Sequence, residues 1–226
     1  MHKLIDRVLK VAAGVVLFAS MSGTAWAGPP LICHPFDAGN AALLPWTSAP
    51  GWKAPDSSYD LQKLTADTLR LLTPTTPVIA RMEIMRRATI YAGQNPRIAA
   101  ALLKAVVDRA KAVPAGSNDP MPWFDAGYLI ETYRQGEGSA GHNMLASAEP
   151  LLADFRHAQA EAGGVGGAEG YSLVLKALKL AGPNAEMEFA ASLMTRNPVA
   201  AEHRRRAVAG AARNSLLAKN LASFGQ

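Results

Sequence analysis

The only cysteine of this 226-residue chain stands beside a histidine, and this pair is the first place in the sequence where chemistry could occur. A thiolate and an imidazole both bind zinc and copper, and a thiol can act as a nucleophile. Cys33 and His34 also match the last two residues of the C-x-x-C-H haem attachment motif, but Pro30 stands in place of its first cysteine. The haem motif is therefore incomplete.

A metal site at Cys33 and His34 would need further ligands from distant parts of the chain. The histidines that follow are His142, His157 and His203. None of them has the H-x3-H or C-x2-C spacing that is typical of zinc sites. We therefore expect no metal and no other cofactor, with a thiol- or metal-dependent site at Cys33 and His34 as the alternative.

Packing is the main interpretation of Cys33. Cysteine is among the residue types most often buried, and it then behaves as a small apolar side chain. One cysteine cannot form an internal disulfide, but a reactive thiol, a mixed disulfide or a dimer bridge stays open in an oxidising compartment. Neighbouring side chains usually point apart, so Cys33 and His34 are not expected to act as nucleophile and base.

Other catalytic patterns do not stand out. The sequence contains no G-x-S-x-G or H-E-x-x-H stretch. Glu131, Glu186 and Glu188 lie in stretches of helical periodicity, and a spacing of two puts Glu186 and Glu188 on different faces of a helix. Because no general acid and base can be paired from these positions, an enzyme is the less favoured class and no catalytic residue is assigned.

A run of arginines near the C-terminus is a candidate site for an anionic partner. It consists of Arg204, Arg205 and Arg206. Guanidinium groups bind carboxylates and phosphates through paired hydrogen bonds. Ordinary surface charge is the alternative that we favour, because Glu202 precedes Arg206, and Glu83 precedes Arg87, by the four residues typical of ion pairs on helix surfaces.

Several methionines recur at helical spacings of three and seven residues. They are Met82, Met85, Met187 and Met194. Copper sites place methionines more densely and together with histidines. We therefore expect these flexible apolar side chains to fill the core.

The first 27 residues have the pattern of a secretory signal peptide. Lys3, Arg7 and Lys10 precede an apolar stretch at 11–19, and a small-x-small cleavage site follows at 25–27. The apolar stretch is shorter than the roughly 20 residues that span a bilayer. We expect a chain that is exported to the periplasm or outside the cell, soluble, and without stable membrane insertion after cleavage. A lipoprotein is less favoured, because the residues before Cys33 are not small.

Removal of residues 1–27 would leave 199 residues, enough for one domain with a sizeable core. Those residues include 20 lysines and arginines and 17 aspartates and glutamates, a net charge of +3. This charge is too small to indicate nucleic-acid binding, and no aromatic residues are interleaved with a basic stripe. We expect no nucleic-acid partner.

Residues 28–57 are rich in helix breakers. Six prolines and three glycines predict irregular or extended backbone here. Phe36, Trp46 and Trp52 would be costly to leave in water. We therefore expect an ordered arm that lies against the rest of the chain and is held by these rings.

Residues 58–226 are expected to form a single all-α domain. Apolar residues recur at helical spacing, and no alternating strand pattern is present. The expected helices are 58–72, 77–92, 96–112, 121–135, 143–161, 168–181, 184–196 and 198–222. Their short connections favour stacked helix hairpins, as in a helical repeat or an irregular bundle.

Local signals mark the expected helix ends. A capping side chain followed by proline, typical of a helix start, occurs at Thr76-Pro77, Asn95-Pro96 and Asn197-Pro198. Glycines that suit a left-handed C-cap stand at Gly93, Gly182 and Gly225.

Two resemblances extend this interpretation. The stretch WFDAGYLIETYRQ, residues 123–135, resembles the first helix of a tetratricopeptide unit, with Trp123, Ala126 and Gly127 at its W-x-x-L-G spacing. This resemblance implies a packing role for Trp123 and Tyr128. The stretches ICHPFDAGNAALLPW, WFDAGYLIETYRQ and EMEFAASLM are similar to those of exported bacterial proteins with a CHPF segment near the mature N-terminus. That second resemblance implies export and a helical fold, and no reaction.

Stacked helix pairs build surfaces that bind peptides or other domains. The sequence therefore favours an exported helical scaffold or protein-interaction module of the bacterial cell envelope, with a protein partner. A thiol- or metal-dependent protein centred on Cys33 and His34 is the alternative.

Overall fold

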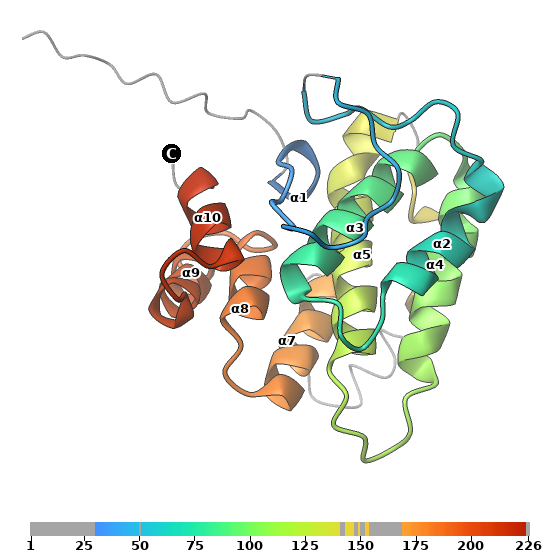
Figure 1. Ribbon diagram of the computed structural model, residues 1–226. Helices are drawn as coiled ribbons and strands as arrows, with labels where there is room; N and C mark the ends of the chain where they lie inside the picture. The colour runs from blue at the N-terminus through green and yellow to red at the C-terminus, as the bar shows by residue number, and fades with distance from the viewer. Residues whose placement is uncertain are drawn as a thin grey trace, which may run out of the picture.

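The computed structural model describes residues 30–49, 51–140, 143–146, 149, 152–153 and 169–224, and in these ranges the chain forms helices and no β-strand (Figure 1). The all-α prediction is confirmed. The helices are α1 Pro30–Cys33, α2 Leu64–Leu71, α3 Val78–Ala92, α4 Pro96–Lys111, α5 Met121–Ala140, α7 Glu169–Ala181, α8 Ala185–Ser192, α9 Val199–Gly210 and α10 Leu216–Ser223. A 3-10 turn, Leu61–Lys63, leads into α2. The expected signal peptide, most of the expected helix 143–161 and Gly225 lie outside the described residues.

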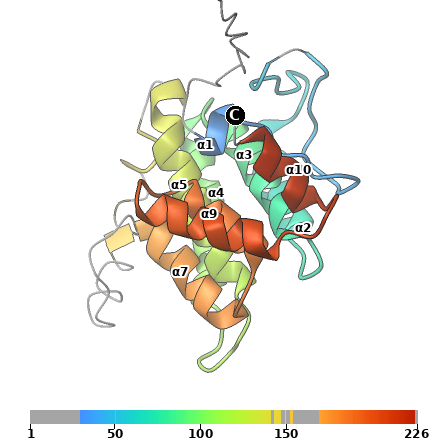
Figure 2. The same ribbon diagram turned by 90° about the vertical axis from the view of Figure 1, so that its left-hand side faces the viewer.

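Helix α5 lies at the centre of the packing. It contacts α1, α3 and α4 on one side and α7 on the other, while α8 pairs with α9 and α10 packs against both (Figure 1). In the turned view of Figure 2, helices α7, α9 and α10 face the viewer. Buried side chains from all these helices therefore form one continuous core.

The α5–α7 crossing is close because a glycine from each helix meets there. A Cβ atom on Gly127 would lie 2.4 Å from the carbonyl oxygen of Gly170, and a Cβ on Gly170 would lie equally close to that of Gly127. The buried carboxylate of Glu131 accepts a hydrogen bond from the backbone N–H of Tyr171 at 3.1 Å. The first amides of a helix lack partners within that helix. Glu131 of α5 supplies such a partner to the first turn of α7.

The helix-end signals of the sequence are confirmed only in part. The Asn95 side chain caps α4, with Pro96 in the first turn, whereas α3 and α9 begin without a side-chain cap. Gly182 has a left-handed φ of 68°, but Gly93 has a helical φ of −60°. Residues 28–57 were expected to be irregular, yet Pro30–Cys33 form the short helix α1.

The expectation of one closing helix over 198–222 is wrong. The chain leaves α9 after Gly210 and turns at Asn214, whose φ is 61°. The Ser215 hydroxyl then accepts a hydrogen bond from the N–H of Ala218 and starts α10. Asparagine tolerates the left-handed conformation and serine is a preferred N-cap, so local turn chemistry outweighs the helical period here.

Helix α3 is buried on nearly every side, and its charged residues are buried with it. Arg81 donates from Nη1 to both carboxylate oxygens of Asp125 on α5, at 2.6 and 2.8 Å. It also binds the carbonyl oxygens of Thr73 and Thr76. Burial raises the pKa of Asp125 to about 6, although the charge of Arg81 acts in the opposite direction.

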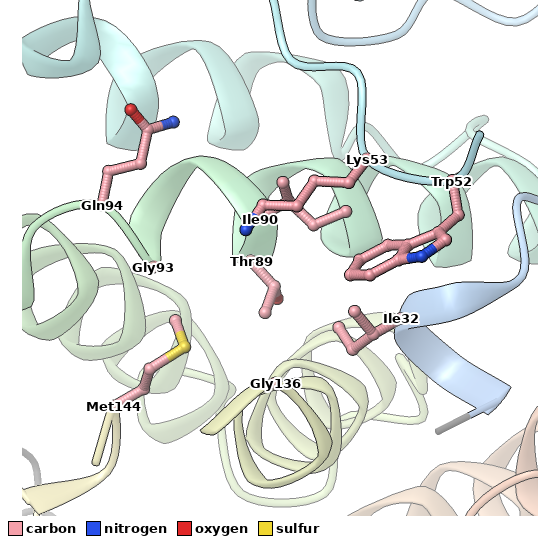
Figure 3. A pocket seen from close by; sticks show the side chains of 9 residues that line it. All are labelled: Ile32, Trp52, Lys53, Thr89, Ile90, Gly93, Gln94, Gly136 and Met144. Carbon is pink, nitrogen blue, oxygen red and sulfur yellow. The ribbon is translucent and has the colours of Figure 1, made fainter. Parts of the chain in front are cut away.

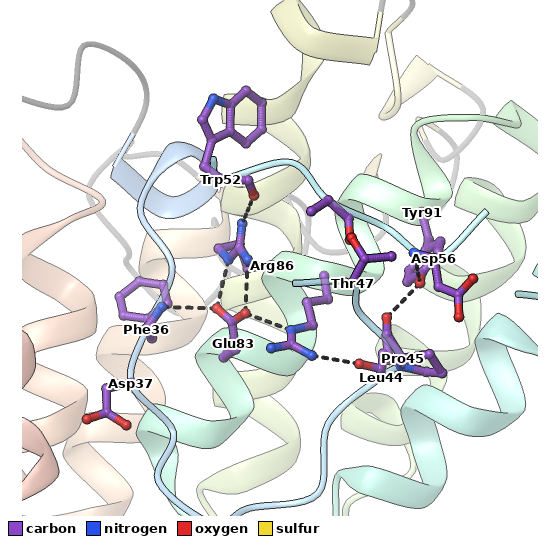
Figure 4. Close-up of polar contacts among 12 residues, drawn as sticks. Phe36, Asp37, Leu44, Pro45, Thr47, Trp52, Asp56, Glu83, Arg86 and Tyr91 are labelled. Atoms are coloured by element: carbon purple, nitrogen blue, oxygen red, sulfur yellow. Dashed lines mark hydrogen bonds and ion pairs between the residues drawn. The ribbon is translucent and has the colours of Figure 1, made fainter. Parts of the chain in front are cut away.

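Glu83 forms the second buried ion cluster of α3, and this overturns the expected surface pair with Arg87. Its carboxylate accepts two hydrogen bonds from Arg86, at 2.7 and 2.9 Å, and one from Arg87 at 2.8 Å (Figure 4). It also accepts the backbone N–H of Phe36 in the arm at 3.0 Å. Glu83 and Arg87 do form the ion pair that their spacing predicts. The pair is not on the surface, because the arm covers this face of α3.

The same arginines hold the backbone of the arm, residues 28–57, along its described part. Arg86 donates to the carbonyl oxygen of Trp52 at 2.8 Å, and Arg87 donates to that of Leu44 at 2.7 Å (Figure 4). Arg86 also donates to the carbonyl oxygen of Ile32 at 3.1 Å. The two guanidinium groups therefore make as many hydrogen bonds to the arm as to Glu83, and these bonds position the arm.

Aromatic side chains fix the arm at two further points. Phe36 is buried and stacks on Phe224, which follows α10, with ring centroids 5.1 Å apart. Trp46 meets Tyr91 edge to face, and the guanidinium groups of Arg86 and Arg87 each lie 5.2 Å from its ring centre. Phe36 and Trp46 thus pack as the sequence predicts for rings that hold an ordered arm.

Replacement of Glu83 tests the buried cluster. We expect Glu83→Gln to lower the free energy of unfolding by about 3–5 kcal/mol, because it leaves two largely buried guanidinium groups without an anion. Urea denaturation of residues 28–226 measures this. Asp108→Asn, which breaks an exposed pair with Lys104, is the matched control and should shift the midpoint little. Equal shifts for the two variants would contradict the assignment.

Candidate functional site

Cys33 is a packing residue in the structure. Its side chain is 6% exposed and lies in a cluster with Ile32 and Ile90, against which Trp46 and Trp52 pack. Burial raises the pKa of the thiol, and the nearby charge of Arg86 only partly opposes this. A buried, protonated thiol is a poor nucleophile.

His34 does not complete a metal site in the described part of the chain. Its ring lies 4.9 Å from the ring of Phe224. No group of three or more histidine, cysteine, aspartate or glutamate side chains that could hold a metal ion is found among the described residues. His142 and His157 lie outside those residues, so the ligand set considered from the sequence is only partly visible.

A small hollow opens beside the Cys33 cluster. It is lined mostly by apolar atoms, with Ile32, Ile90 and Met144 around it and Trp52 along one side (Figure 3). Its volume is about 40 Å³, which is room for water and not for a substrate. The hydroxyl group of Thr89, which also lines it, already pairs with that of Thr132 at 2.8 Å.

The three arginines of the C-terminal run do not form one patch. Arg204 donates to the carbonyl oxygen of Leu221, and Arg205 pairs with Glu202. Arg206 pairs with Glu202 at 3.0 Å, as the sequence predicts for a surface pair, and lies 3.7 Å from Glu188. Successive residues of a helix point in different directions, so the three arginines contact different groups.

Trp123 and Tyr128 both pack within the helical body. Trp123 is half-buried, and the ammonium group of Lys176 on α7 lies 3.1 Å from its ring centre. Tyr128 is fully buried and stacks on Phe124, and its hydroxyl has no hydrogen-bond partner among the described residues.

The methionines are confirmed as core residues. Met82, Met85 and Met187 are buried, and Met194 is partly buried and packs against the same core.

A larger hollow, here called the C-terminal groove, lies between α7, α8 and α9. Its volume is about 760 Å³. The α7 residues Leu175, Leu178 and Lys179 form one wall, and Arg206 and Ala209 of α9 line another. Leu175 is 39% exposed and is the one large apolar residue of the lining that is exposed. This groove is the best candidate site in the described chain.

A hydrogen-bonded chain of three side chains ties the walls of the groove together. Glu188 on α8 bonds to Nδ1 of His203 on α9 at 2.5 Å, and Nε2 of the same ring bonds to the hydroxyl of Tyr171 on α7 at 2.7 Å. His203 is only 4% exposed. Each of the three helices contributes one member, so the chain fixes their relative positions.

This arrangement resembles a nucleophile, base and orienting group, but its chemistry favours a structural role. His203 is buried and its Nε2 atom is covered by the hydroxyl group of Tyr171, so a substrate cannot reach the ring directly. Burial raises the pKa of Tyr171, the charge of Glu188 adds to this, and Arg206 opposes it. A phenol that holds its proton is not an activated nucleophile.

The sequence could not reveal this chain of contacts. Tyr171, Glu188 and His203 are 17 and 15 residues apart and stand on separate helices, so no motif connects them. His203 entered the sequence analysis only as a possible metal ligand. The groove residues Leu175 and Lys179 carried no signal beyond the amphipathic period of their helix.

Comparisons with known proteins give no relative. No family model, curated protein or solved structure matches the chain. None of the helices in the described ranges is long and apolar enough to cross a bilayer.

The burial of Cys33 predicts its reactivity. At pH 8 the thiol of the folded chain should react with a disulfide reagent at least 100-fold more slowly than in denaturant, because it is covered and protonated. Absorbance of the released thiolate follows the reaction. The control is Cys33→Ser combined with Ser57→Cys, whose exposed thiol should react quickly in both conditions. Rapid reaction of native Cys33 would revive the thiol-site alternative.

The Glu188–His203–Tyr171 chain predicts a graded loss of stability. His203→Phe keeps an aromatic ring but leaves two polar partners unpaired, so the free energy of unfolding should fall by about 1–3 kcal/mol. Tyr171→Phe should cost less, and Arg206→Gln, at a half-exposed position, should cost least. Urea denaturation gives the order of the three. An Arg206→Gln effect as large as that of His203→Phe would show that the chain is not the main tie.

Proposed function

We propose that this protein is an exported helical scaffold of the bacterial cell envelope that binds another protein through the C-terminal groove. The exposed Leu175 inside a groove of about 760 Å³ carries this proposal, because exposed apolar side chains in a concave surface are typical of binding sites. Export rests on the signal-peptide pattern of residues 1–27.

The ionisable groups elsewhere support a binding role over a catalytic one. Glu83 and Asp125 are buried and fully engaged with arginines, and Glu131 is engaged with Arg134 and the first turn of α7. Their contacts hold the helices and the arm together, and these carboxylates offer no accessible acid and base pair in the described part of the chain. The thiol alternative is less well supported, because Cys33 is buried beside a hollow with room only for water.

A photoreactive amino acid placed at position 175 tests the proposal in living cells. Adducts are analysed in the envelope fraction, where N-terminal sequencing of the chain should begin at Gly28 if the leader is removed as expected. We expect a discrete adduct from position 175, because that side chain points into the groove, and none from position 104, an exposed site on α4. The same pattern at both positions, or no adduct at 175, would overturn the proposal.

A further inference from the structure

We infer that the C-terminal groove binds an amphipathic helix whose flanking side chains are acidic; this inference rests on the proposed function and names the chemistry of its partner. Three observations lead to it: helices and no sheet edge form the walls of the groove, small residues lie along the groove, and the side chain of Lys179 at its edge has no ion-pair partner among the described residues.

The backbone chemistry of the groove favours a helical partner. Its walls are the helices α7, α8 and α9, and no β-strand occurs among the described residues, so the groove offers no sheet edge to an extended peptide. An extended segment buried here would leave its own N–H and C=O groups unpaired. A helix satisfies its backbone internally and can present a row of apolar side chains to Leu175 and Leu178.

Small residues give the groove its depth. Gly182, Ala185, Ala209 and Gly210 are all among its lining residues. Ala185 and Gly210 touch across α8 and α9, since a Cβ on Gly210 would lie 2.6 Å from the Cβ of Ala185. The two helices thus approach closely, and the space above them is left open for larger side chains of a partner, with a volume within the range of about 300–1,000 Å³ found for ligand sites.

The charges around the groove indicate an acidic partner. Residues 169–226 contain eight lysines and arginines but only four glutamates. Three of these glutamates are engaged: Glu186 accepts the N–H of Ile79, Glu188 binds His203, and Glu202 pairs with Arg205 and Arg206.

Lys179 at the edge of the groove is left without such a counter-charge. It is exposed, lines the groove, and forms no ion pair with a described residue. Arg206 is 55% exposed on the α9 wall and has donors left beyond its two glutamates. Carboxylates on a docked helix would give Lys179 a counter-charge, and their attraction to Lys179 and Arg206 would direct the approach of the helix.

Selection from a random peptide library tests the inference. The bait is the chain 28–226, and peptides that also bind the Leu175→Asp variant are removed. We expect enriched sequences with leucine or aromatic residues at i, i+3 or i+4, and i+7, flanked by aspartate or glutamate. Fluorescence polarisation then measures the affinity of the most enriched peptide.

Two matched variants and two peptide changes decide the outcome. Lys179→Glu should weaken binding at least 10-fold, and a peptide with lysine in place of its acids should regain affinity for that variant. Lys104→Glu on α4, the same charge reversal away from the groove, should have no effect. A proline in the middle of the peptide should abolish binding, because it breaks a helix.

The results separate a failure of this inference from a failure of the proposed function. Enrichment of neutral or basic peptides, or no effect of Lys179→Glu, would overturn the acidic partner while the groove stays a binding site. Tolerance of the central proline would overturn the helical partner. If no peptide is enriched whose binding depends on Leu175, the proposed function fails together with the inference.

Discussion

The structure depends on how the buried carboxylate of Glu83 is neutralised. A charge that loses its water must be paired and hydrogen-bonded, and Glu83 achieves this with two arginines and one backbone amide. Those arginines need acceptors of their own, and the arm supplies them as the carbonyl oxygens of Ile32, Leu44 and Trp52. An irregular, proline-rich segment is well suited to this because its backbone carbonyls are not used in helices or strands. The arm is therefore an internal part of the ion cluster, and the face of α3 beneath it can be charged and buried at once.

Other polar side chains also accept hydrogen bonds from backbone N–H groups of a different element, as Glu83 does. Glu131 of α5 accepts an amide from the first turn of α7, and Glu186 of α8 accepts one from the first turn of α3. Asn220 of α10 exchanges two hydrogen bonds with the backbone of Asp37 in the arm. Helix N-termini carry unpaired amides and a partial positive charge, so a carboxylate there is stabilised twice. Each contact joins segments far apart in the sequence, which lets a chain with short helices hold them in defined positions.

The sequence predicts local structure well and long-range pairing poorly. Apolar periodicity found the helices of the body, and the aromatic residues of the arm indicated that it packs, because both signals lie within one segment. The break between α9 and α10 was missed, since one asparagine and one serine outweighed a period that continues through them. Glu83 was assigned to the surface because its helical partner Arg87 is visible in the sequence, whereas the arm that covers both residues is about 40 residues away. The contact of Glu188, His203 and Tyr171 involves three helices and has no sequence pattern at all.

Helix α8 joins the arm to the groove, because it carries side chains that contact each of them. Phe189 packs edge to face against Phe36 of the arm and against Phe224, while Glu188, next to it in sequence, points to the groove and binds His203. An eight-residue helix is too short to hold its position alone. It is supported by the arm, by α10 and by the Glu188–His203–Tyr171 chain. Walls fixed in this way do not have to be ordered when a partner binds, so less of the interaction energy is lost to conformational entropy. The buried charges under the arm and the shape of the groove are in this sense parts of one arrangement.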